Sequence, residues 1–123
     1  MRLESDPTVK YVTGSTDFIL PSDELNLDSA YNTYVIGGLP VGPICNPSKA
    51  AIEAALHPNQ DYINEGYLYF CSKDPSSGEL QFSRTLEEHE AAVAQYRPLW
   101  EAYDAEQRAK AAETPQPTEG TNP

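Results

Sequence analysis

The sequence predicts an α+β domain. Two short runs rich in strand-forming residues, YLYFCS at 67–72 and LQFS at 80–83, are separated by turn-forming residues, which is typical of a β-hairpin. Helix-forming segments with capping residues lie on both sides of this hairpin. The 123 residues are 39% hydrophobic, enough for one domain core. We therefore expect short helices, an ordered Gly/Pro loop and a β-hairpin packed by a C-terminal helix.

The N-terminal third predicts little regular structure. The segment VKYV at 9–12 gives a weak strand pattern. The segment PSDE at 21–24 is typical of a helix start, with Ser22 as the cap, and we expect one or two turns that end near Asn26. The segment GGLPVGPICNP at 37–47 holds three glycines and three prolines, which indicates a shaped, ordered loop.

Two helices are expected in the rest of the chain, besides a trailing run. Asn46 is a good N-cap and Pro47 suits the first helical position, so an Ala-rich helix is expected from there to Pro58, packed closely against a sheet or another helix. The segment TLEE at 85–88 is a capping-box pattern that opens the second helix. Pro98 is expected to end or kink it, with another helical run following over 99–112.

Charge excludes several classes of function. The formal net charge of −11 argues against nucleic-acid binding and against docking on an anionic membrane surface. No apolar run is long enough for a membrane span, and residues 1–10 lack the apolar core of a signal peptide. Cys45 and Cys71 lack metal-site spacing and are interpreted as two free, half-buried thiols, or as one bridge if the chain lies outside the cytoplasm.

Few residues are candidates for chemistry. The segment YNTY at 31–34 suits sugar recognition, since rings stack on pyranose faces while amide and hydroxyl groups bond hydroxyls; the alternative is a strand entry that bonds the backbone. Asp6, before a proline, is expected to be extended and either bonds its own turn or faces a ligand. His57 and His89 are interpreted as structural. No metal, nucleotide or other cofactor site is indicated.

An ordered series of segments resembles the YceG-like family, the endolytic murein transglycosylases. The resemblance runs from about Met1 to Tyr96. Its segments are Ser5–Val9, Tyr31–Tyr34, Gly38–Ile44, Asn46–Pro47, Ala54–Leu56, Pro58, Tyr67–Phe70 and the pattern FSxTLxxH at 82–89.

The resemblance implies an enzyme that cuts the glycan strands of peptidoglycan without water and leaves 1,6-anhydro-muramic acid ends. One glutamic acid of the family acts as acid and then as base. Family members are usually anchored at the extracytoplasmic face of the cell membrane, and the resemblance suggests cell-wall synthesis machinery as a partner. Asp6, Thr8, Tyr31, Asn32, Thr33 and Tyr34 match segments near the family's cleft, and they are our candidate substrate-binding residues.

The resemblance also divides the chain. Residues 1–98 are expected to be the C-terminal portion of a YceG-like catalytic domain, 99–113 a trailing helix and 114–123 a disordered tail. The family's catalytic glutamate lies upstream of the segment that resembles Ser5–Val9, and Glu4 stands where a glutamine is common. We therefore assign no catalytic residue and expect an incomplete catalytic domain, inactive alone. The alternative is a stand-alone glycan-binding or regulatory module.

Overall fold

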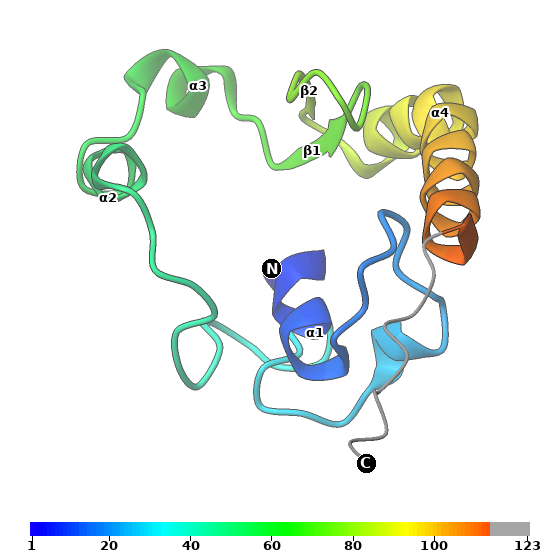
Figure 1. The fold of residues 1–123 in the computed structure, drawn as a ribbon. Coiled ribbons are helices and arrows are strands. Elements are labelled where there is room, and N and C mark those ends of the chain that lie inside the picture. Colours follow the sequence, from blue (N-terminus) through cyan, green and yellow to red (C-terminus); the bar gives the residue numbers. More distant parts are fainter. Residues whose placement is uncertain (114–123) are drawn as a thin grey trace.

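The computed structural model describes residues 1–113, and it confirms the α+β class. The predicted tail at 114–123 lies outside the described residues. Figure 1 shows α2 and α3 at one side of the molecule and α4 at the other. The elements in chain order are α1 (Asp6–Thr13), the 3-10 turn η1 (Glu24–Asn26), α2 (Lys49–Leu56), α3 (Gln60–Glu65), β1 (Tyr69–Ser72), β2 (Leu80–Ser83) and α4 (Leu86–Glu113).

The predicted hairpin is confirmed, although β1 begins at Tyr69, two residues after the predicted start. β1 and β2 pair antiparallel, with Phe70 opposite Phe82 and Tyr69 opposite Ser83. In the connecting turn, the backbone N–H and hydroxyl of Ser76 both donate to the Asp74 carboxylate at 2.8 Å, and these bonds lower the pKa of Asp74. The expected turn chemistry is therefore what joins the strands.

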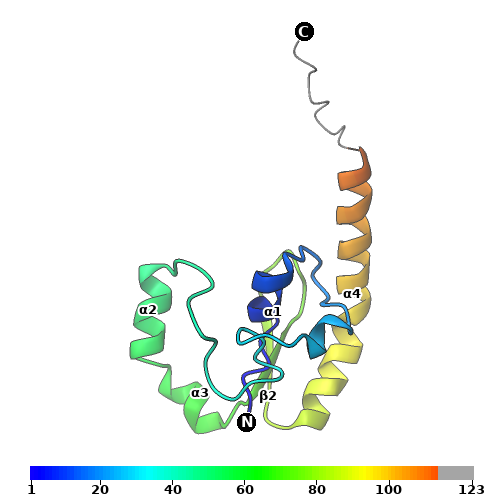
Figure 2. The same ribbon diagram turned by 90° about the horizontal axis from the view of Figure 1, so that it is seen from below.

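α4 begins with the predicted capping box. The N–H of Glu88 donates to the Thr85 hydroxyl at 3.1 Å, and the Glu88 carboxylate accepts from the N–H groups of Arg84 and Thr85. Pro98 does not end the helix, which continues to Glu113. Figure 2 shows instead a bend in α4, as expected where a proline removes one backbone donor.

The core lies between the hairpin, α4 and the 17–20 segment. Cys71 of β1 packs with Ala92 and Trp100 of α4, and Phe18 and Ile19 pack against them. The Trp100 indole N–H donates to the carbonyl of Ser72 at 3.0 Å, so the ring is fixed at both its apolar and polar ends.

The 17–20 segment is fastened to α4 by a buried carboxylate. Asp104 is 5% exposed and accepts hydrogen bonds from the backbone N–H groups of Phe18 at 2.6 Å and Ile19 at 3.0 Å. Arg108 pairs with Asp17 at 3.0 Å just outside it. These bonds join residues more than 80 positions apart, so they tie the second half of α4 to the N-terminal third of the chain.

The prediction of a strand over residues 9–12 was wrong, since α1 occupies this segment. Asp6 is helical rather than extended, and Pro7 lies in the first turn, where its missing N–H costs nothing. Gly14 closes the helix with φ 71°, donating its N–H to the Lys10 carbonyl at 2.8 Å. These two end signals outweigh the weak strand pattern, and Val9 is completely buried.

The intervening helices differ from prediction in their starts and contacts. η1 ends at Asn26 as expected, but its N-cap is Asp23 rather than Ser22. α2 is capped by Ser48, whose hydroxyl accepts from Ala51 N–H at 3.1 Å, and not by Asn46.

The expected close packing of α2 was wrong, because none of its residues is buried. α3 was not predicted. It is capped by Asn59 and ends at Gly66 in the left-handed conformation.

Candidate functional site

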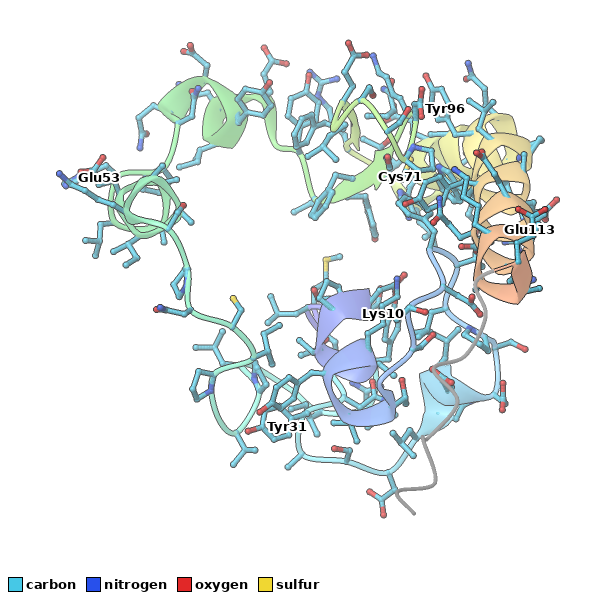
Figure 3. The ribbon with its side chains drawn as sticks, in the orientation of Figure 1. Lys10, Tyr31, Glu53, Cys71, Tyr96 and Glu113 are labelled. Atoms are coloured by element: carbon cyan, nitrogen blue, oxygen red, sulfur yellow. The ribbon has the colours of Figure 1, made fainter. Side chains whose placement is uncertain are left out.

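The YNTY segment lies alongside α1 and meets it in reverse order. Tyr31 stands beside α1 in Figure 3. This arrangement brings all six predicted substrate-binding residues into one cluster, although they come from segments about 25 residues apart. The contacting pairs are Tyr31 with Tyr11, Thr33 with Thr8, and Tyr34 with Asp6.

Two buried threonines, hydrogen-bonded to each other, form the middle of the cluster. The hydroxyls of Thr8 and Thr33 are 2.8 Å apart, and both side chains are buried. The Thr8 hydroxyl donates to the Ser5 carbonyl at 2.7 Å, while the Ser5 N–H donates to the Thr33 hydroxyl at 2.9 Å. Both hydroxyls are thus satisfied within the chain, and they lock the segment to the start of α1.

Asn32 is also used within the fold. Its side chain has no exposed surface, and its amide donates to the carbonyls of Leu25 at 3.1 Å and Leu27 at 2.8 Å. Its oxygen accepts from the N–H of Tyr34 at 2.9 Å. Asn32 therefore ties η1 to the cluster and sets the direction of the Tyr34 backbone.

Tyr34 and Asp6 form the polar end of the cluster. The Tyr34 hydroxyl donates a short hydrogen bond to the Asp6 carboxylate, and both side chains are half-buried. Burial raises the pKa of Tyr34, and the bond to Asp6, its charge and the charge of Glu4 raise it further. Tyr34 consequently stays protonated as a fixed donor. No other donor within residues 1–113 bonds the Asp6 carboxylate, so it keeps acceptor capacity.

Tyr31 and Tyr11 form the aromatic end. Their ring centroids are 5.0 Å apart and the Tyr11 side chain is 53% exposed. The loop after the cluster closes on Tyr31, since a Cβ on Gly42 would lie 2.8 Å from the Tyr31 hydroxyl oxygen. Val41 N–H donates to the Ala30 carbonyl at 3.2 Å and holds this approach. The Gly/Pro loop is therefore shaped around a tyrosine.

Sequence reasoning did not single out Tyr11 as a site residue. Interpreting 9–12 as a strand separated Tyr11 from the face that carries Thr8. On a helix the two residues are three positions apart and therefore neighbours, so a helical assignment would have found it.

The remaining reactive side chains lie apart from this cluster. The His89 ring stacks on Tyr69 with centroids 5.2 Å apart, and His57 caps the end of α2. The prediction that both thiols are half-buried was wrong, since Cys45 is exposed and Cys71 is buried; both are free, and burial raises the pKa of the Cys71 thiol. Within residues 1–113 no group of three His, Cys, Asp or Glu side chains could hold a metal ion. In the same range no helix is long and apolar enough to cross a membrane.

Comparisons with known proteins give a consistent result. The model of the YceG-like family matches residues 1–95. A Bacillus subtilis protein named endolytic murein transglycosylase is 46% identical over 97 residues, which are 78% of this chain and 25% of that protein. A Streptococcus pneumoniae protein of the same name is 33% identical over 101 residues, covering 78% of this chain and 17% of that protein.

A solved structure extends the similarity to the fold. The crystal structure of a YceG-like protein from Listeria monocytogenes superposes with a TM-score of 0.64 at 44% identity, covering 74% of this chain and 28% of that one. The chain thus spans about a quarter of the length of its relatives from Bacillus and Listeria.

Proposed function

The chain belongs to the YceG-like family, and from this premise we propose that it forms the C-terminal part of an endolytic murein transglycosylase. Its substrate is then the glycan strand of peptidoglycan, cut without water to leave 1,6-anhydro-muramic acid ends. The observation that carries the proposal is the 46% identity to the Bacillus protein of that name over 97 residues, together with the family match over residues 1–95, which include the 31–34 cluster.

In this proposal the cluster is one wall of the glycan cleft, and its residues divide into two kinds. Asp6, Tyr31 and Tyr34 keep accessible surface and contact sugar. The Asp6 carboxylate accepts from a hydroxyl or acetamido N–H, and the Tyr31 ring stacks on a pyranose face. Thr8, Asn32 and Thr33 are positioning residues, since their polar atoms are bonded within the chain.

Rigidity supports this assignment. A side chain held by neighbours in the unbound protein loses little conformational entropy when it binds, so more of its interaction energy reaches the ligand. Asp6 is held by Tyr34, and the Tyr34 backbone is held by Asn32. A wall built in this way also fixes the position of a glycan bond relative to a general acid.

We assign the general acid to no residue of this chain. In the proposal that role falls to a glutamate in another part of a YceG-like polypeptide, and this chain alone does not cleave glycan. We place the working enzyme at the extracytoplasmic face of the membrane, where murein lies, with cell-wall synthesis machinery as its neighbour.

The test is a chimera in which this chain replaces the matched 97 residues of the Bacillus relative. Incubated with murein sacculi, it should release fragments with 1,6-anhydro ends, detected by mass spectrometry. Asp6→Asn should lower the rate about tenfold or more, because a charge-assisted hydrogen bond contributes roughly 1.5–3 kcal/mol. Asp28→Asn is the matched control, since Asp28 is exposed and outside the cluster.

Two outcomes would contradict the proposal. A folded chimera that releases no anhydro product would overturn the transglycosylase assignment. Equal rates of product release for Asp6→Asn, Tyr34→Phe and the control would show that the cluster does not line the glycan cleft. Glycan binding by the isolated chain, combined with an inactive chimera, would favour the binding-module alternative.

A further inference from the structure

An apolar groove lies between α3 and the hairpin, away from the 31–34 cluster. It encloses about 250 Å³, and its lining is mostly apolar and aromatic. Three of its side chains are unusually open for their size: Ile63 is 53% exposed, Leu68 62% and Phe70 63%. Hereafter the α3–hairpin groove means the surface formed by Tyr62, Ile63, Tyr67, Leu68, Phe70 and Phe82.

The groove is ordered although little covers it. Tyr62 packs its ring against Phe82 with centroids 4.8 Å apart and against Tyr67 at 5.6 Å. Arg84 stacks on Tyr67 and pairs with Glu65, the last residue of α3. These contacts hold a six-residue helix in place, which is too short to be stable by itself.

The preceding helix, α2, also leaves its apolar side chains uncovered. α2 reads KAAIEAAL, yet no residue in it is buried; Ile52 is 48% exposed and Leu56 69%. An eight-residue helix rich in apolar side chains gains most of its stability from burying them. α2 and α3 therefore both present surface suited to a further layer of protein.

We propose that the α3–hairpin groove is the docking site for another part of a YceG-like polypeptide, namely the part of its relatives that lies outside the matched quarter. Chain length favours this occupant: the same residues align with 25% of the Bacillus protein and 28% of the Listeria chain. In the Listeria structure the similar fold is thus one portion of a longer chain. The proposal rests on family membership and does not require glycan cleavage.

The chemistry of the groove also favours a polypeptide layer. Interfaces that are permanently buried resemble a domain core cut in half, with large apolar and aromatic side chains at the centre. In the α3–hairpin groove Leu68 and Phe70 are the most exposed apolar side chains, and Arg84, paired with Glu65, stacks on Tyr67. The lining also holds Asn59 and three tyrosines, but its most exposed large apolar side chains, Ile63, Leu68 and Phe70, offer a glycan strand no hydrogen bond.

The first experiment is titration of the full chain with the purified remainder of the Bacillus relative, meaning that protein without its matched 97 residues. Calorimetry should show binding, and amide exchange should slow in α3 and β1. Phe70→Asp should weaken binding at least tenfold, because a charge replaces the most exposed apolar side chain of the groove. Leu99→Asp is the matched control, since Leu99 is 52% exposed and lies on α4.

The second experiment places the same substitutions in the chimera with the Bacillus relative and does not depend on the remainder folding alone. Phe70→Asp should lower the midpoint of thermal unfolding of the chimera by several degrees but leave the isolated chain nearly unchanged, while Leu99→Asp leaves both unchanged. An equal effect of Phe70→Asp in the two contexts would overturn the proposal. So would a concentration-dependent dimer of the isolated chain that Phe70→Asp abolishes, since the occupant would then be a second copy. If the chimera is inactive but Phe70→Asp still destabilises the chimera alone, the docking proposal stands and the transglycosylase proposal fails.

Discussion

Replacing Asp104 by alanine should destabilise the fold more than any change at an exposed carboxylate. The substitution leaves the backbone N–H groups of Phe18 and Ile19 without their acceptor in a site that is 5% exposed. Hydrogen bonds to a charged group contribute roughly 1.5–3 kcal/mol each. The cost of burying the carboxylate offsets part of this sum. We therefore expect a net loss of about 3 kcal/mol.

The loss can be followed with an intrinsic probe. The chain has one tryptophan, Trp100, one helical turn before Asp104 in the core. Urea unfolding followed by its fluorescence should show a lower midpoint for Asp104→Ala, and the melting temperature should fall by roughly 10 °C, as expected for a domain of this size. Asp104→Asn keeps a carbonyl acceptor and should lose about half as much. Asp28→Ala is the exposed control, and equal midpoints for it and Asp104→Ala would refute the fastening role of Asp104.

Three further predictions concern the cluster and the thiols. Because the pKa of Tyr34 is raised in the folded state, its contribution to stability is present below about pH 10 and declines above it; Tyr34→Phe should cost about 1 kcal/mol at pH 7 and reduce the alkaline decline in a pH series of urea midpoints. Gly42→Ala crowds only the end of the Tyr31 side chain, so the free energy of unfolding should change by no more than about 1 kcal/mol. The NMR chemical shifts of the Tyr31 ring should change, and unchanged shifts would contradict the close approach of Gly42 to Tyr31. Dithionitrobenzoate should modify Cys45 rapidly and Cys71 only on unfolding, because Cys71 is buried and burial raises its thiol pKa.

Sequence reasoning succeeded where local signals act alone. The capping box at Thr85–Glu88 and the β2 strand at 80–83 were predicted at the correct residues, since cap and turn chemistry are fixed by a few neighbours. α1 was missed because the weak alternation over 9–12 was weighed above Pro7 and Gly14, two helix-end signals outside that window.

The candidate cluster shows where such reasoning ends. The sequence identified Asn32 and Thr33 as polar residues suited to a site, but polarity does not reveal which atoms face outward. Both are fully buried: Asn32 bonds the carbonyls of Leu25 and Leu27, in and just after η1, and Thr33 bonds Ser5 and Thr8. Those partners lie five to 28 positions away, so only the three-dimensional arrangement separates contact candidates from positioning residues.

The bonds between Asp104 and the 18–19 segment also bear on the order of folding. They close a loop of more than 80 residues, whose entropy cost grows as the logarithm of its length and amounts to roughly 4 kcal/mol. Contacts this distant are expected to form late, after the hairpin and the local helices. During synthesis the segment around Phe18 leaves the ribosome long before Asp104 is made, so its apolar side chains stay exposed in the meantime. A chaperone that binds short apolar segments should accordingly prefer nascent chains that end before Asp104, and release them once the second half of α4 emerges.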